Sequence, residues 1–346
     1  MSYWKKITRS NFLIKLRSWE YWPFGIIQFP AILYWLWLSL RSRSLVFFSA
    51  SNPGIPTGGM FGESKFDILK TIPEQYLPET IFFSLPVSTA QVITRIDSAG
   101  MKLPLIFKPD IGERGFMVEK INEQKEIEDY LRRIKVSFLV QEWVQLPLEF
   151  GVFYMKFPID QKGKVISVVA KEMLAVTGDG KSSLQELIFR NDRAKLQWKK
   201  LKVSYHGRLS CIVPRDEKVE LVSVGNHALG TRFIDASHLI NDRLSNTFDS
   251  ISNQIPGFYF GRFDLRCATA EDLYGGKIKI MELNGCGAMP VHIYDTDFSF
   301  WKALSVQVIH WDHIFRIARA NKKQGVRYMS HKEAFAFYRK FKAALK

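Results

Sequence analysis

Four polar side chains on two apolar segments have the types and spacing of a phosphoryl-transfer site. Arg262 and Asp264 stand two residues apart in "GRFDLR", and Glu282 and Asn284 stand two residues apart in "MELNG". Residues two apart in a strand share one face of a sheet. Carboxylate and amide oxygens suit Mg²⁺, which keeps its other positions for water and phosphates. We predict that Asp264, Glu282 and Asn284 bind metal and that Arg262 is catalytic, stabilising charge on a transferred phosphoryl group.

Weaker signals for nucleotide contacts lie upstream. Lys108 stands near the end of an expected strand, where it can contact phosphates, and a glycine-containing loop that can close over them follows. The next expected strand, "SFLVQEWV", offers backbone groups that can pair with adenine, and a later carboxylate can accept from ribose hydroxyls. The predicted nucleotide contacts here are Lys108, Gly112, Gly115, Glu142, Trp143, Val144 and Glu149.

The segment "VTGDGKSSL" contains a Gly-Lys-Ser that invites comparison with a phosphate-binding P-loop. That pattern requires a glycine five positions before its last glycine. Ala175 stands at this position, so the segment is not a P-loop. Ser183 and Glu186 are in capping-box register and predict that a helix begins here.

Expected strands and helices alternate through the body of the chain and predict an α+β fold, with mixed sheets flanked by helices. The expected strands are 103–110, 137–144, 164–174, 258–268 and 277–284. The expected helices are 122–134, 183–192, 233–255, 298–319 and 330–346.

In this order the segments resemble the ATP-grasp superfamily of carboxylate–amine or carboxylate–thiol ligases, with similarity to D-alanine–D-alanine ligase and cyanophycin synthetase. The resemblance covers about residues 62–295. Its most specific part is R-x-D followed by E-x-N and two glycines, Gly285 and Gly287. The "V-x-GDGK" loop, followed by "LI" and then Asn191 and Asp192, is similar to that of cyanophycin synthetases. The resemblance implies two α+β subdomains that clasp ATP, with the GDGK loop near the phosphates.

The resemblance also implies the reaction. The γ-phosphoryl group of ATP passes to a small-molecule carboxylate, and an amine, or less favourably a thiol, attacks the acyl-phosphate. Two Mg²⁺ ions, with Mn²⁺ as an alternative, bridge the phosphates, and the catalytic residues Arg262 and Lys108 hold the developing charge. Lys65 matches an earlier ATP-contacting lysine, and Lys171 stands where cyanophycin synthetases tend to have arginine. The alternative is an ATP-grasp protein that phosphorylates or only binds a small ligand.

The expected organisation has a reduced N-terminal region. We expect a basic aromatic segment at 1–50, a reduced lobe at 51–100, a nucleotide-binding subdomain at 101–160, a C-terminal subdomain with the metal site at 161–325 and a basic amphipathic helix at 326–346. Three separated cysteines without C-x-x-C spacing favour a reducing cytoplasm.

The net charge of +15 belongs to the two ends of the chain. Residues 1–43 hold seven Lys or Arg and one acid, residues 316–346 hold ten and one, and the rest holds 32 of each sign. A neutral body without a groove-reading motif argues against nucleic acid as a partner. The last helix, 330–346, is predicted either to dock on the body with a solvated cationic face or, with the basic N-terminal end, to lie on an anionic membrane surface, which attracts cations.

The apolar segment 23–40, "PFGIIQFPAILYWLWLSL", is close to the short limit for crossing a bilayer, and we expect Pro30 to break its helix. Five of the nine tryptophans lie in the first 37 residues, and tryptophan prefers the membrane interface. The segment is therefore predicted either to lie in the interface, peripheral on the inner face of the membrane, or to pack on the protein's own core.

Overall fold

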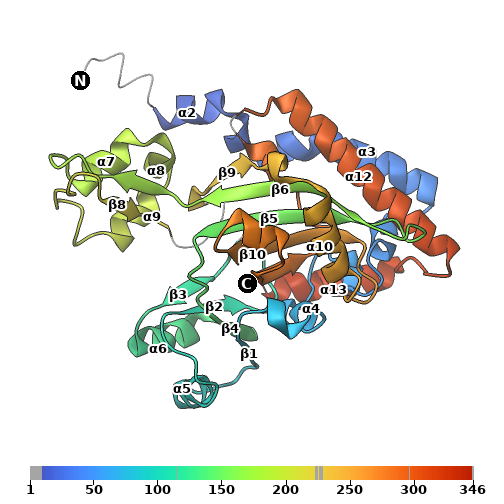
Figure 1. Cartoon of the computed structure of the whole chain (residues 1–346), viewed down its shortest axis with the longest axis horizontal. Coiled ribbons are helices and arrows are strands. Elements are labelled where there is room, and N and C mark those ends of the chain that lie inside the picture. Colours follow the sequence, from blue (N-terminus) through green and yellow to red (C-terminus); the bar gives the residue numbers. More distant parts are fainter. Residues whose placement is uncertain (1–9, 114, 223–224, 226–228, 296, 345–346) are drawn as a thin grey trace.

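The chain folds into antiparallel sheets with helices at their sides (Figure 1), which confirms the predicted α+β class. This computed structural model describes residues 10–113, 115–222, 225, 229–295 and 297–344.

The largest sheet has five strands in the order β11-β10-β5-β6-β9, and all neighbouring strands are antiparallel. Val152, Phe263 and Leu265 on its strands pack with Phe248 of α10 in the main hydrophobic core. The sheet therefore has one face fixed by the core, and alternate residues are left to build a site on the other. The elements are β5 (Leu148–Met155), β6 (Lys164–Glu172), β9 (Arg232–Asp235), α10 (Asp242–Ser252), β10 (Phe260–Cys267), α11 (Ala270–Tyr274) and β11 (Ile278–Asn284).

A four-stranded sheet in the order β1-β4-β2-β3 forms a second layer, with α5 and α6 packed on one face. The rings of Phe107, Phe138 and Tyr130 contact one another in its core, and all three side chains are fully buried. The elements are α4 (Lys65–Leu69), β1 (Thr80–Phe83), α5 (Thr89–Ser98), β2 (Leu105–Pro109), β3 (Glu119–Ile121), α6 (Gln124–Arg133) and β4 (Phe138–Glu142).

A small module at one end of the molecule (Figure 1) has a core of its own, to which Leu184, Ile188 and Leu201 contribute. Ser183 and Glu186 form the predicted capping box at the start of α7, which confirms that helix. The elements are β7 (Ala175–Thr177), α7 (Leu184–Arg190), α8 (Asp192–Leu196), α9 (Trp198–Ser204) and β8 (Lys218–Glu220).

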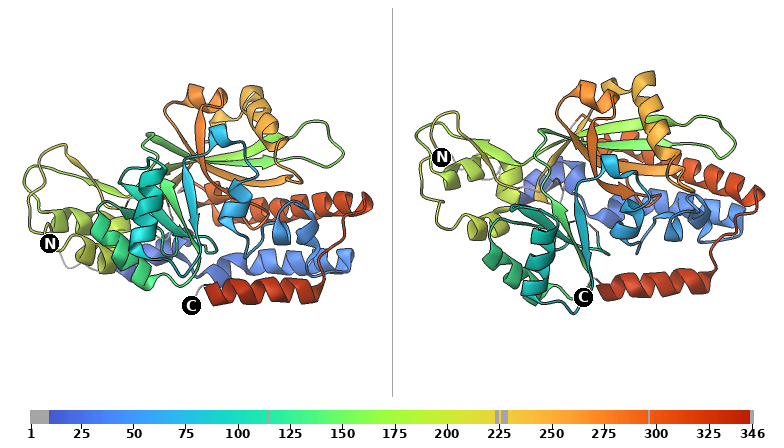
Figure 2. Two further views of the ribbon diagram at one scale, coloured as in Figure 1. Left: turned by 90° about the horizontal axis from the view of Figure 1, so that it is seen from below. Right: turned by 60° about the horizontal axis from the view of Figure 1, so that its bottom comes forward.

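The two ends of the chain form a helical layer along one side of the molecule (Figure 2), in which α12 packs on α3. Ser330 and Glu333 cap the last helix reciprocally, as predicted. Over the described residues, none of the helices combines the length and the apolar character that crossing a bilayer would need. The helices are α2 (Asn11–Arg17), α3 (Phe24–Ser42), α12 (Phe300–Lys323) and α13 (His331–Ala344).

Helix α3 is apolar on two opposite faces. Ile27, Ala31 and Leu38 are buried against the body, which confirms that this segment packs on the protein's own core. The other face carries a stripe of side chains at three- and four-residue spacing with exposed fractions of 41% to 78%, and we call it the α3 stripe. Its members are Ile26, Phe29, Leu33, Leu36, Trp37 and Leu40.

Two predictions about these elements are wrong. Pro30 lies inside α3 without ending it. A proline removes one helical hydrogen bond, and the packing of the buried face outweighs that loss. The predicted helix 233–255 is interrupted because Phe233 and Ile234 pair with β6 as part of β9. The helix begins only at Asp242, where the Asn241 side chain accepts from the N–H of Leu244.

Candidate active site

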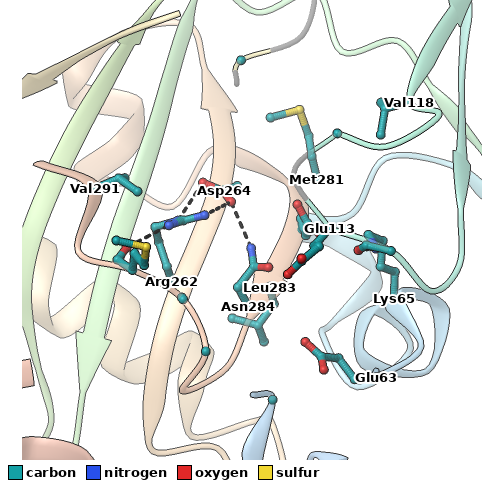
Figure 3. Close-up of a pocket in the computed structure, with 18 of the residues that line it drawn as sticks. Glu63, Lys65, Glu113, Val118, Arg262, Asp264, Met281, Leu283, Asn284 and Val291 are labelled. Atoms are coloured by element: carbon teal, nitrogen blue, oxygen red, sulfur yellow. Dashed lines mark hydrogen bonds and ion pairs between the residues drawn. The ribbon is translucent and has the colours of Figure 1, made fainter. Parts of the chain in front are cut away.

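The two predicted pairs of polar residues lie opposite each other on adjacent strands. Asp264 of β10 is in register with Glu282 of β11, and Arg262 is in register with Asn284. Figure 3 shows the side chains of Arg262, Asp264 and Asn284 directed toward one another in the cavity. The structure therefore brings the four predicted residues together on one side of the sheet.

Asp264 is the centre of this group. Arg262 donates to both of its carboxylate oxygens at 3.1 and 2.9 Å, and the Asn284 amide donates at 3.0 Å. Burial by itself raises the pKa of Asp264, but the opposite charges of Arg262 and Lys171 outweigh it and lower the pKa to about 2. Asp264 is therefore a fixed anion at neutral pH.

Lys171 of β6 completes the group, although it was not among the predicted site residues. Its Nζ lies 3.1 Å from Asp264 Oδ1 and 3.1 Å from Glu149 Oε1. Its side chain is 7% exposed. Burial lowers the pKa of Lys171, yet the two carboxylates outweigh burial and raise it, so the lysine stays charged.

Gly151 on β5 makes room for the group. A Cβ atom at this position would stand 3.1 Å from the Arg262 side chain and 3.3 Å from Asp264 Oδ1. Gly151 and Lys171 join Asp264 because β5 pairs with β10, which is distant in sequence, and β6 pairs with β5.

Lys108 faces the same cavity from the four-stranded sheet. Its Nζ donates to Gln141 Oε1 at 2.9 Å and to the carbonyl oxygen of Met281 at 3.0 Å. Burial lowers the pKa of Lys108 to about 8, because Glu282 and Asp264 offset only part of the desolvation. A bound anion beside Lys108 would therefore stabilise the charged form of this lysine.

Lys65, the first residue of α4, contacts the loop that follows β2. Its Nζ donates to the carbonyl oxygen of Gly112 at 2.5 Å, and Asp110 accepts from the Ser64 hydroxyl and the Phe66 N–H at 2.9 Å each. Gly112 and Gly115 also line the cavity. The intervening Arg114 is outside the described residues.

The segment after β4 lines the part of the cavity predicted to hold the nucleoside, which is formed by Glu142, Trp143 and Val144. Arg266 donates to the Val144 carbonyl at 3.0 Å and packs against the Trp143 ring. Its guanidinium also holds Glu149 Oε2 at 2.8 and 3.0 Å. Glu149 is thus fixed by Arg266 and Lys171, whereas Glu142 is exposed at the cavity.

The donor set fits a magnesium ion that takes most of its ligands from elsewhere. Glu282 lines the cavity, and its side chain makes no hydrogen bond or ion pair with any described residue. The ionised Asp264 and the amide oxygen of Asn284 lie beside it. The described part of the chain contains no group of three His, Cys, Asp or Glu placed as a self-sufficient metal site. Mg²⁺ needs no such group, because it retains water and binds substrate phosphates.

The cavity between the two sheets has a volume of about 690 Å³, within the range of small-molecule sites. Cys286 and Gly287 line this cavity. Two backbone hydrogen bonds join them to the N-terminal region, from Cys286 N to Gly58 O at 3.0 Å and from Gly287 N to Gly59 O at 2.9 Å. A Cβ at Gly285 would stand 2.5 Å from Gly58 O, so this close approach requires glycine.

The GDGK loop lies away from this site. None of residues 176–183 lines the cavity, so the prediction that this loop lies near the phosphates is wrong. Asp179 instead accepts from the N–H groups of Lys181 and Ser182 at 2.9 and 2.6 Å. These contacts shape the turn that leads into α7, which is sufficient reason for the sequence pattern.

Comparison with known proteins finds solved structures but no matching family model and no matching curated protein. A D-alanine–D-alanine ligase from Bacillus anthracis superposes with a TM-score of 0.42 at 13% identity, covering 76% of this chain and 69% of that one. The VanG D-Ala:D-Ser ligase from Enterococcus faecalis gives 0.40 at 14%, with 72% and 61% covered. A bifunctional glutathione synthetase from Pasteurella multocida gives 0.36 at 16%, with 70% and 35% covered.

The chain spans 35% to 69% of the length of the three proteins. Because the identities and TM-scores are low, we base the proposed function on the residues of the cavity.

Proposed function

We propose that this protein is an ATP-dependent ligase of the ATP-grasp type, which activates a carboxylate as an acyl-phosphate and joins it to an amine. One observation carries the proposal: Arg262, Asp264, Glu282 and Asn284 form two cross-strand pairs on the wall of a cavity that Lys108 lines from the four-stranded sheet and Lys65 lines from α4. Oxygen ligands facing fixed cations across a cavity suit a metal-bound triphosphate.

The first step transfers the γ-phosphoryl group. A carboxylate oxygen of the substrate attacks the γ-phosphorus, the bond from that phosphorus to the β,γ-bridging oxygen breaks, and ADP leaves. Arg262 and Lys108 stabilise the charge on the transferred group, which is the role of fixed donors in such reactions. Bound Mg²⁺ would neutralise phosphate charge, and Asp264, Glu282 and Asn284 are the residues that would hold it.

The second step forms the new bond. The amine nitrogen attacks the acyl carbon, the bond between that carbon and the phosphate oxygen breaks, and the amine proton is lost to solvent or to the departing phosphate. A thiol would react in the same way and give a C–S bond. No side-chain nucleophile takes part, so the protein contributes by positioning and electrostatics.

The nucleoside would lie against the segment after β4. Backbone groups from Glu142 to Val144 would pair with adenine, and the exposed Glu142 is better placed than the ion-paired Glu149 to accept from ribose hydroxyls. Lys65, Gly112 and Gly115 would close over the phosphates, since all three line the same cavity.

We also propose that the ligase works in the cytoplasm, on an anionic membrane surface. The α3 stripe is exposed, and Arg41 and Arg43 stand at the end of the same helix. An apolar helix face next to cations suits the interface of an anionic bilayer.

The proposed reaction is tested by ADP release from Mg-ATP with a panel of carboxylic acids in the presence of hydroxylamine. An activated acyl group is trapped as a hydroxamate, which identifies the carboxylate substrate. ADP release without hydroxamate would instead support a kinase, and nucleotide binding without ADP release under all conditions would support a binding protein.

A further inference from the structure

We propose that an apolar groove beside the catalytic cavity binds the hydrocarbon chain of an amphiphilic substrate, whose polar end reacts in the cavity. This inference rests on the proposed ligase function and specifies its substrate class: a carboxylate or amine that carries one long aliphatic chain.

The groove lies between α3 and α13, which run along the same side of the molecule (Figure 2). It has a volume of about 650 Å³, and its lining is apolar or aromatic except for Gln28 and His331. Ile32 and Trp35 of α3 form one wall, and Ala334 and Phe335 of α13 form the other. Such a lining offers dispersion contacts and few polar partners, so it favours a hydrocarbon over a polar ligand.

The groove and the catalytic cavity share a boundary. Gln28, Met60, Phe61 and Trp311 line both spaces. The Gln28 amide is held at this boundary by a 3.8 Å contact to the sulfur of Met289. Methionine and glutamine side chains are flexible, and a contact to sulfur is weak. Displacement of the Gln28 and Met60 side chains would open a passage for a chain between the two spaces.

Two buried polar atoms in the catalytic cavity lack a hydrogen-bond partner among the described residues. Gln307 is 4% exposed and lines the catalytic cavity one helical turn before Trp311. Its Oε1 accepts no hydrogen bond from the described residues, and neither does Glu63 Oε2 (Figure 3). A buried acceptor without a donor is unfavourable. Polar N–H or O–H groups of a substrate would satisfy both atoms while its chain lies in the groove.

Continuity with the cavity selects a substrate chain over other occupants of the groove. A membrane or a second protein copy would cover the outer face of α3 and α13, but neither explains why the groove continues into the site. A chain attached to the reacting group explains both the shared wall and the unpartnered acceptors.

The test measures binding without nucleotide, so it does not depend on ligase activity. Saturated n-alkanoic acids of increasing length with a terminal bromine are titrated below their micelle concentration, and quenching of Trp35 and Trp311 fluorescence is recorded. The expected dissociation constant falls about fourfold per added methylene until the groove is full. Ala334→Phe, which fills the groove, should abolish this dependence. Ala336→Phe, on the exposed side of the same helix, should retain it.

The results separate the groove from other occupants and from the ligase proposal. No dependence on chain length, or equal dependence in both variants, would overturn the groove. Quenching seen only with brominated lipid vesicles would assign the surface to the membrane instead. A wild-type dimer in light scattering that Ala334→Phe dissociates would assign it to a second copy. Chain binding without ADP release from Mg-ATP for any acid would leave the groove in place and remove the ligase function.

Discussion

Lys171 Nζ lies 3.1 Å from Asp264 Oδ1, and this buried ion pair connects β6 to the predicted metal ligand across the intervening strand β5. The same ammonium group lies 3.1 Å from Glu149, which Arg266 holds from the other side. The phosphate end and the nucleoside end of the site are thus joined through one lysine. Displacement of any member would disturb both ends.

We predict that Lys171→Met destabilises the protein by about 3 kcal/mol, at the low end for breaking a buried pair, because Arg262 and Arg266 still compensate the two carboxylates. The free energy of unfolding in urea measures the change. Lys162→Met, at an exposed position before the start of β6, is the control and should be neutral. Equal stability of the two variants would show that the pair contributes little.

The pH dependence of that difference follows from Asp264. Its folded pKa is about 2, below the ordinary 3.8, so its contribution to stability is complete above about pH 4 and is lost as the pH falls toward 2. Removing Lys171 raises the folded pKa of Asp264. The stability difference between Lys171→Met and wild type should therefore shrink between pH 4 and pH 2, and a constant difference across that range would contradict the assignment.

Asp264→Asn should reduce ADP release at least about 100-fold while leaving the circular dichroism spectrum unchanged. The substitution keeps the shape of the side chain but removes the charge that would bind metal and orient Arg262. Electron paramagnetic resonance of Mn²⁺ with ATP provides a second readout, in which the variant should lose the protein-bound signal. Full turnover in the folded variant would contradict the metal assignment.

Lys108 should make nucleotide binding sensitive to alkaline pH. Its pKa of about 8 in the free protein means that the lysine is charged below pH 8 and neutral above it. ATP affinity, measured with a fluorescent analogue, should fall up to about tenfold per pH unit above 8. Lys108→Met should bind weakly at every pH without this limb, whereas Lys102→Met, at an exposed position, should behave as wild type. A flat profile for the wild type would contradict the role of Lys108.

Leu40→Glu in the α3 stripe should weaken sedimentation with anionic vesicles about tenfold, because it removes apolar contact and adds a negative charge. Val203→Glu, at a similarly exposed position on α9, serves as the matched control. Wild-type binding should also weaken at high salt. If Leu40→Glu and wild type sediment alike, the α3 stripe is not a membrane surface.

The four residues that carry the site could be predicted because their signal is local. Residues that stand two apart in a strand share one face of the sheet. The two strands also follow each other in the chain and pair directly, which places Asp264 opposite Glu282. The capping pairs Ser183–Glu186 and Ser330–Glu333 are equally local, and both helices begin where predicted.

The other features of the site and fold depend on contacts between segments that are far apart in the sequence, so no short sequence pattern predicts them. Lys171 and Gly151 reach the site through strand pairing, and Phe233 belongs to a strand because β6 offers an open edge. The GDGK pattern indicates a turn correctly, but its distance from the cavity depends on where the small module is attached. The groove likewise arises from helices at the two ends of the chain.

The most direct test of the central claim follows an oxygen atom. The acid that yields a hydroxamate is labelled with ¹⁸O in its carboxylate and allowed to react to completion with Mg-ATP and its amine. Transfer through an acyl-phosphate places one ¹⁸O atom in the released inorganic phosphate, which mass spectrometry detects, and this is the predicted result. Label in AMP, or unlabelled phosphate beside the product, would contradict the proposed reaction.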